Sequence, residues 1–201
     1  MWLVEHSSMS TLLALVGKIP AGHVAGQARL QTAVAWAHTL LHQSAAAQSA
    51  LDLAEAVMPS DATLTDHDRF ELGVEGLVVQ SCIDMYGDRV NHVNELDEKC
   101  FAQADLLRPW IVSVAANVST FKKIHDGDYS LALEQQRWAS KFHGQTSGPF
   151  SGVYGHCFAG LAAYALLDLD RVDQHFTAAV ELGRRKAGRY SHAARLAGAM
   201  M

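Results

Sequence analysis

The chain has 201 residues, of which 49% are hydrophobic and 18% charged, and its formal net charge is −5. The acidic excess excludes a general electrostatic attraction to nucleic acid or anionic membranes, and the longest apolar stretch, 110–118, is too short to span a bilayer. The apolar residues are mostly alanine and leucine, which favours helix over strand, and three widely spaced cysteines indicate a reduced, cytoplasmic protein (Cys82, Cys100 and Cys157).

Helices are the elements that the apolar spacing predicts, and they follow one another in pairs. A first helix is expected over about 8–16, ended by Gly17 and Pro20, and a last one over about 190–201. Between them, the pattern predicts four antiparallel pairs. The predicted pairs cover about 28–58, 66–107, 109–143 and 150–187. Thr65 is placed to cap the helix that begins at residue 66.

A polar turn residue recurs about every forty residues between apolar helical segments. The residues concerned are Ser44, Asp88, Asp128 and Asp170. Serine and aspartate favour the N-cap position because a side-chain oxygen accepts a hydrogen bond from the unpaired amides of the first helical turn. A capped turn of this period predicts an all-α fold, namely an α-solenoid of TPR-like antiparallel helix pairs. We therefore expect one helical-repeat domain over residues 1–201, wound as a right-handed superhelix.

The sequence carries no pattern typical of a catalytic, cofactor-binding or metal-binding site. His38 and His42 have the i, i+4 spacing of a zinc site but lack the glutamate that a zinc peptidase places beside the first histidine. The glycine-rich segment 144–152 lacks the Gly-Lys-Ser/Thr ending of a phosphate-binding loop. His156 and Cys157 are adjacent on a helix, so their side chains diverge. We predict no enzyme activity, no cofactor and no metal site.

Two features of the predicted helices have a structural explanation and a functional alternative. The basic run 184–186 is favoured by the dipole at a helix C-terminus, and it is too narrow to predict direct nucleic acid binding. Glycines within the predicted helices indicate close packing between helices, with approach of a ligand to the backbone as the alternative. These glycines are Gly73, Gly76, Gly152, Gly155 and Gly160.

Several segments resemble a known helical-repeat region. They are a leucine-rich helix ending in Ile-Pro (12–20), an Arg-Leu link (28–30), an Ala-Trp-Ala helix (33–37), an alanine-rich partner (51–55) and a later interhelical turn (166–173). This pattern is similar to that of MalT-like LuxR-family transcriptional regulators. The resemblance implies a region that senses an inducer or a regulatory protein. In that family an ATP-binding module precedes the repeats and a helix-turn-helix module follows them, but this chain matches neither motif, so neither activity is carried over.

The function predicted on this basis is a non-catalytic ligand- or protein-binding sensor scaffold, a fragment or truncated relative of a MalT-like regulator. A generic tetratricopeptide-like adaptor unrelated to transcription is the alternative, and an all-helical enzyme is the weakest hypothesis. We expect a protein partner or a small-molecule inducer to bind on the first helices of the pairs, where Trp36, Trp110 and Tyr154 lie. Burial is the commoner role for such aromatics, although binding surfaces also use them as anchors.

The C-terminal segment predicts self-association. Residues 190–201 form an apolar, alanine-rich helix for which the sequence offers no partner helix. An uncapped repeat end leaves an apolar surface that normally requires cover. A second copy of the chain would supply it.

Overall fold

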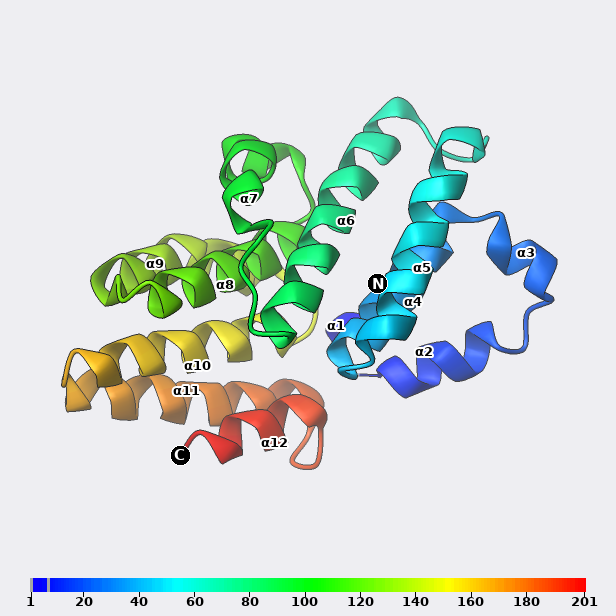
Figure 1. Ribbon diagram of the computed structural model, residues 1–201. Helices are drawn as coiled ribbons and strands as arrows, with labels where there is room; N and C mark the ends of the chain where they lie inside the picture. The colour runs from blue at the N-terminus through cyan, green and yellow to red at the C-terminus, as the bar shows by residue number, and fades with distance from the viewer. Residues whose placement is uncertain (1, 7) are drawn as a thin grey trace. The chain divides into compact units, whose positions relative to one another are not determined.

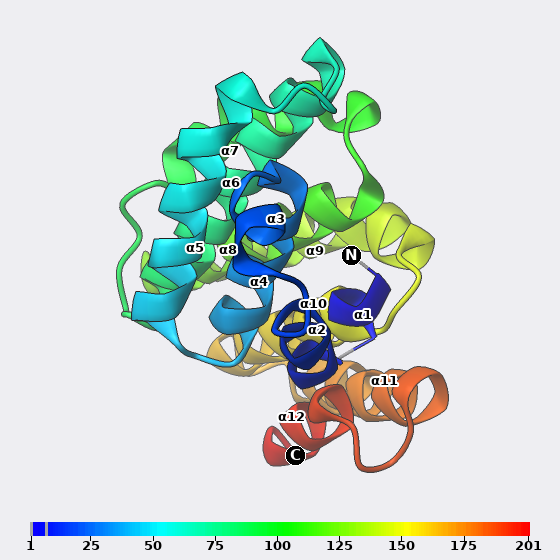
Figure 2. The same cartoon turned by 90° about the vertical axis from the view of Figure 1, so that its right-hand side faces the viewer.

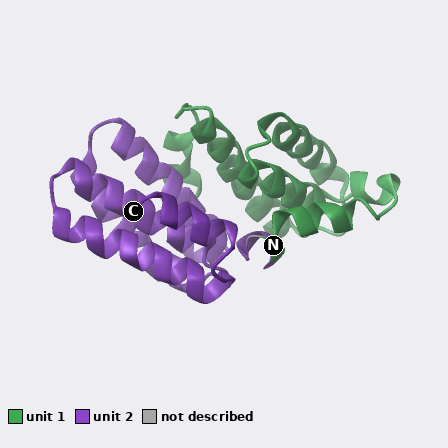
Figure 3. Ribbon diagram, turned by 90° about the horizontal axis from the view of Figure 1, so that it is seen from below, with its two compact units in different colours: residues 1, 3, 8–102 green, residues 2, 4–7, 103–201 purple. Residues whose placement is uncertain are grey.

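The computed structural model describes residues 2–6 and 8–201, and every regular element among them is a helix. Helices account for 79% of the chain, which confirms the predicted all-α class. The superhelical order of TPR-like pairs stays a prediction. The chain divides into two compact units, an N-terminal unit mainly of residues 8–102 and a C-terminal unit mainly of residues 103–201 with most of 2–6 (Figure 3). No helix in the described part is long and apolar enough to cross a membrane.

The N-terminal unit is built around α4, α5 and α6. Its elements are α2 (Met9–Val16), α3 (Ala21–Ala25), α4 (Ala28–Leu40), α5 (Ser44–Val57), the 3-10 turn η1 (Met58–Ser60), α6 (Asp66–Tyr86) and α7 (Val93–Lys99). Helix α4 packs against α5 and α6 (Figure 1). Helices α2 and α3 also contact α4. Thr65 caps α6 as predicted, since its hydroxyl accepts a hydrogen bond from the Asp68 amide and the Asp68 carboxylate accepts one from the Thr65 amide.

The second member of the predicted pair 66–107 is not one helix, which corrects that expectation. Helix α7 ends at Lys99, and a 3-10 segment, η2 (Phe101–Leu106), follows with non-helical dihedrals at Gln103. The apolar residues that suggested a continuous helix are nevertheless buried, namely Val93, Leu96, Cys100, Ala104 and Leu107. Spacings of three and four residues suit both an α-helix and a 3-10 turn, so periodicity did not distinguish them.

Helix α10 is the centre of the C-terminal unit. Its elements are α1 (Trp2–Glu5), α8 (Pro109–His125), α9 (Tyr129–Gln145), α10 (Phe150–Ala165), α11 (Leu169–Ala187) and α12 (His192–Ala199). Helix α10 packs against α8, α9, α11 and α12, and Figure 2 and Figure 1 both show α11 beside α12. The carboxylate of Glu5 in α1 accepts hydrogen bonds from the amide and hydroxyl of Ser147, at 2.9 and 2.6 Å.

The last helix is partly covered within the unit. Ala193, Ala194 and Ala197 are buried, and α12 packs against α10 and α11. Gly183 of α11 allows the close approach, because a Cβ there would lie 3.0 Å from Cα of Ala194. Self-association through residues 190–201 stays a prediction, and it would have to use the exposed side of this segment.

The predicted N-caps at the turns need correction. Asp128 is the N-cap of α9, but its side chain makes no capping hydrogen bond. Ser44 is already the first residue of α5, and Asp170 lies inside the first turn of α11, where Asp168 is the N-cap and accepts a hydrogen bond from the Arg171 amide. The remaining expected cap, Asp88, precedes the start of α7 at Val93.

The recurring element at these turns is a C-terminal cap. Each of the four turns has one residue with a positive φ of 56–85°, and these residues are His42, Asp88, Gly127 and Leu167. In each turn the next amide donates to the carbonyl five positions earlier, at 2.8–3.0 Å. This is the Schellman arrangement, which pairs the carbonyl groups left free at a helix C-terminus. The sequence pattern therefore placed the turns correctly. It attributed the capping to the N-terminus of the following helix, whereas the recurring cap lies at the C-terminus of the preceding helix.

Candidate binding groove in the C-terminal unit

A groove of about 590 Å³ lies within the C-terminal unit, between α9 and α11 and over α10. Cavities of this volume are typical of small-molecule sites. The first wall is one face of α9, lined by Leu133, Gln136, Arg137, Ser140, His143 and Gly144. The second wall is one face of α11, lined by Arg171, Gln174, His175, Leu182, Arg185 and Lys186. The floor comes from Gly148 and, on α10, from Gly152, Gly155, His156 and Ala159.

Glycines in α10 allow the two walls to come close to the floor. A Cβ on Gly155 would lie 2.6 Å from Oε1 of Gln136 and 2.7 Å from Nε2 of His143. A Cβ on Gly152 would lie 2.9 Å from a methyl group of Leu182. A Cβ on Gly160 would lie within 2.9 Å of three atoms of the Phe176 ring. The predicted close packing is therefore confirmed for the α10 glycines.

The two glycines of α6 differ from those of α10. A Cβ on Gly73 would have no atom of another residue within 4 Å, and one on Gly76 would make an ordinary 3.5 Å contact with Leu51. Close helix packing does not require glycine at either position. The structure gives no physical reason for glycine at position 73, where it costs roughly 1 kcal/mol relative to alanine.

A chain of hydrogen bonds leads from α8 to the groove and fixes the orientation of His143. The amide nitrogen of Gln136 donates to Asn117 at 3.0 Å and to Thr120 at 2.8 Å, which leaves its oxygen as an acceptor. Nε2 of His143 lies 3.0 Å from that oxygen and must therefore carry the hydrogen. Nδ1 then accepts from the hydroxyl of Ser113. This tautomer is neutral, with both ring nitrogens engaged.

The three histidines of the groove have lowered pKa values. Burial lowers the pKa of His143 to about 4, with a smaller contribution from the positive charge that His156 can carry. Burial also lowers the pKa of His156, assisted by His175, and that of His175, assisted by Arg171. Nδ1 of His156 and Nδ1 of His175 lie 3.2 Å apart, so one ring must donate to the other. The pair therefore cannot easily hold two protonated Nδ1 atoms at once.

The charge of the groove is one-sided. Four of its lining residues are permanent cations, Arg137 from α9 and Arg171, Arg185 and Lys186 from α11, and none is an aspartate or glutamate. Arg171 pairs with Asp168 at its N-terminal side, at 3.2 Å. Within the described residues, no ion pair is found for Arg137, Arg185 or Lys186. An anionic group is therefore the complement that this groove lacks.

The three aromatic residues predicted as binding anchors do not line the groove. Trp36 is fully buried in the N-terminal unit, where its indole donates to Oε1 of Glu75 at 2.8 Å. Trp110, in α8, is 2% exposed. Tyr154 is half-buried on α10, with Phe150 and Phe158 at ring-centroid distances of 5.0 and 5.8 Å. Their contribution to binding stays a prediction, and for the two tryptophans a ligand would first have to displace core packing.

Sequence reasoning missed the groove because it concentrated on first helices and on aromatic residues. Both walls are second helices of the predicted pairs, and most of the side chains that they contribute are polar. A signal was present in α9, where the polar residues Gln136, Arg137, Ser140 and His143 recur at helical spacing. Gln136 lies on the same buried face as the alanines of this helix. The basic run 184–186 also contributes two lining residues, although the helix dipole alone accounted for its position.

Nucleophile and metal chemistry find little support in the described part of the chain. Burial raises the pKa of the thiols of Cys82, Cys100 and Cys157 to about 12, so none is a ready thiolate. All three are free and buried. No group of three or more metal-ligating side chains is found among the described residues.

Comparisons with known proteins point to one kind of relative. No family model and no solved structure matches the chain. It is similar to the serine/threonine-protein kinase PknK of Mycobacterium tuberculosis and of Mycobacterium bovis, with 35% identity over 199 residues in each case. The match covers 99% of this chain but 18% of each relative. The chain thus spans about a fifth of the length of the relatives that it matches.

Proposed function

We propose that this chain is a non-catalytic helical module of a larger regulatory protein, and that it binds a ligand or partner in the groove between α9 and α11. The observation that carries the proposal is the groove itself. It combines a volume suited to a small molecule with polar side chains from two helices and a floor of small residues. The similarity to about a fifth of a much longer kinase supports a role as one part of a larger protein.

A sensor segment of a MalT-like LuxR-family regulator is the finer form of this proposal. The resemblance at 12–20, 28–30, 33–37, 51–55 and 166–173 supports it. The alternative is an interaction adaptor unrelated to transcription, and the name of the matching relatives favours it, because they are described as kinases. In either case the proposed location is the cytoplasm, which the three buried free cysteines support.

The absence of catalysis is part of the proposal. Among the lining residues there is no carboxylate and no cysteine, so acid–base chemistry would depend on histidine. His143 already uses both ring nitrogens in hydrogen bonds to Ser113 and Gln136. A groove with fixed donors, but without a nucleophile and base aimed at a common point, suits binding better than chemistry.

A ligand screen with a blocked groove tests the proposal. Thermal shift measurements on the full chain would use neutral and charged metabolites, and calorimetry would give the affinity of each hit. Ser140→Trp places an indole on the α9 wall, whereas Gln145→Trp places it on an exposed position of the same helix outside the groove. We expect hits to bind at least ten-fold more weakly to the first variant and normally to the second. Hits that bind both variants equally, or no hits at all, would contradict the proposal.

A further inference from the structure

We infer that the groove binds the phosphate group of a phosphorylated small molecule, held between Arg137 of α9 and Arg185 of α11. This inference deepens the proposed binding function and rests on it. The guanidinium groups come from both walls, so an anion at the centre of the groove can be approached from two sides. A guanidinium group offers paired N–H donors in the geometry that phosphate oxygens accept.

The amount of positive charge favours phosphate over a single carboxylate. Arg171 is paired with Asp168, which leaves Arg137, Arg185 and Lys186 as lining cations without an ion pair within the described residues. A carboxylate would bring one negative charge and two acceptor oxygens. A phosphomonoester brings close to two charges and three strong acceptor oxygens, and it therefore matches the excess better. The chain as a whole is acidic, so the attraction is local to this groove.

The size of the cavity favours a small molecule over a polymer. A volume of about 590 Å³ is several times that of a phosphate group, and ligand pockets generally fall within ~300–1,000 Å³. Apolar surface for the organic part comes from Leu133, Ala159 and Leu182. A nucleic acid backbone would require a longer basic track than this one groove provides.

The histidine pair supplies a second, independent consequence of anion binding. His156 and His175 line the groove together with neutral His143 and four permanent cations, namely Arg137 from α9 and Arg171, Arg185 and Lys186 from α11. Burial is the main cause of their lowered pKa values, and repulsion contributes, from His175 in the case of His156 and from Arg171 in the case of His175. A bound dianion would favour the protonated rings and raise both pKa values. By linkage, affinity for the dianion should rise as pH falls through the pKa values of the complex.

Calorimetry with named anions tests the proposal on the full chain at constant ionic strength. The probes are inorganic phosphate, glucose 6-phosphate, glucose and the monocarboxylate glucuronate. We expect saturable binding of both phosphates, tighter for glucose 6-phosphate, and at least ten-fold weaker binding of glucose and glucuronate. Arg137→Gln and Arg185→Gln should each weaken phosphate binding at least ten-fold. The matched control is Arg184→Gln, which removes the same charge one residue outside the lining and should change affinity less than two-fold.

The pH dependence of the affinity is measured with sulfate from pH 8 to pH 5, because sulfate stays a dianion throughout this range. Affinity should increase towards low pH, and nuclear magnetic resonance titration should show higher pKa values for His156 and His175 in the complex. His175→Gln should flatten the profile. Equal losses in the Arg184 and Arg185 variants would show non-specific charge attraction and overturn the proposal, as would unchanged histidine pKa values. A phosphopeptide that binds much more tightly than glucose 6-phosphate would overturn the small-molecule class.

The two proposals fail separately. If neutral metabolites bind and Ser140→Trp blocks them while no anion binds, the phosphate assignment is wrong and the groove remains a binding site. If neither neutral nor anionic probes bind in a manner that Ser140→Trp blocks, both are wrong.

Discussion

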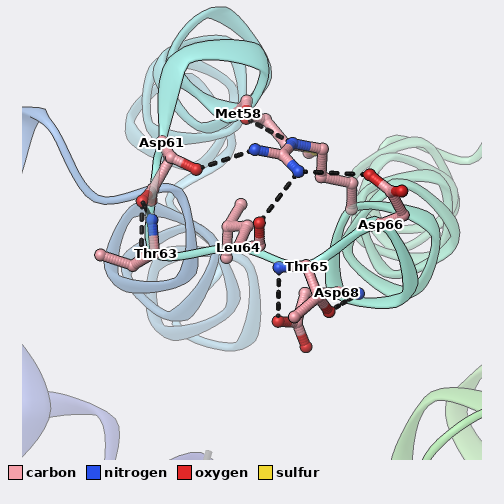
Figure 4. A network of polar contacts seen from close by, with 8 residues as sticks. Met58, Asp61, Thr63, Leu64, Thr65, Asp66 and Asp68 are labelled. Atoms are coloured by element: carbon pink, nitrogen blue, oxygen red, sulfur yellow. Dashed lines mark hydrogen bonds and ion pairs between the residues drawn. The ribbon is translucent and has the colours of Figure 1, made fainter.

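Arg69 of the N-terminal unit and Arg137 of the C-terminal unit are both arginines of long helices, and the structure uses them differently. The Arg69 guanidinium donates to the backbone carbonyls of Met58, Leu64 and Asp61, at 3.4, 2.9 and 3.0 Å (Figure 4). Arg137 has no ion pair with any described residue and faces the groove. The first arginine closes a loop of its own chain, and the second leaves its donors available.

A similar contrast holds between the carboxylates near the start of α6 and the network around His143. In the N-terminal unit, Asp61 accepts hydrogen bonds from Thr63 and from the Ala28 amide, and the bond from the Thr63 hydroxyl is the main cause of its lowered pKa. The capping bond from Thr65 lowers the pKa of Asp68 to about 2, assisted by Arg29. Carboxylates thus serve as internal acceptors in that unit. In the C-terminal unit, the network around His143 is neutral and extends to the surface of the groove.

The largest expected effect tests whether the buried polar contact of the N-terminal unit is structural. Trp36→Ala removes a fully buried ring and leaves Glu75 without the indole donor, so we expect a loss of ~3–5 kcal/mol in the free energy of unfolding. Urea unfolding measures this. Hydrogen exchange should show the loss in α4–α6 and unchanged protection in α9–α11. A loss below about 1 kcal/mol would show that neighbouring side chains fill the space left by Trp36. The buried polar contact of the N-terminal unit would then not be required for its stability.

A pair of glycine substitutions compares the two units directly. Gly155→Ala pushes a methyl group between Gln136 and His143, and overpacking of this kind costs ~1–3 kcal/mol. Gly73→Ala meets no neighbouring atom in α6 and should stabilise the chain by ~0.5–1 kcal/mol. Thermal and urea unfolding of both variants would show opposite signs. The same sign for both would mean that the close approach at Gly155 relaxes without cost.

The smallest effect concerns the helix caps of the C-terminal unit. Asp168→Ala removes the hydrogen bond to the Arg171 amide and should cost ~1 kcal/mol, the usual value of an N-cap. Asp128→Ala, at the N-cap of α9, removes no such bond and should stay within ~0.5 kcal/mol of the parent chain. Chemical denaturation of the two variants provides the measurement. A larger loss for Asp128→Ala would restore the cap that the sequence predicted.

Local patterning was sufficient to predict most of the longer helices of this protein, but not the short helices α1 and α3. The predicted segments 28–58, 109–143 and 150–187 correspond closely to the pairs α4–α5, α8–α9 and α10–α11, and Thr65 was recognisable as an N-cap from its residue type. These features depend on residues a few positions apart, so their physics is contained in a short stretch of chain. The break at Gln103 was not recognisable, because the apolar spacing on either side fits both helix types.

The groove was decided by tertiary structure alone. Its cations and histidines belong to three helices, and nothing in the sequence of α9 specifies that Arg137 faces the same cavity as Arg185. The glycines of α10 show the same limit, because their role depends on which side chain of another helix lies above them. Gly73 and Gly155 are both glycines within helices, yet open space surrounds the first and Gln136 and His143 press on the second. Helical periodicity tells which side of a helix is apolar, whereas charge complementarity and close approach arise only when helices distant in sequence pack together.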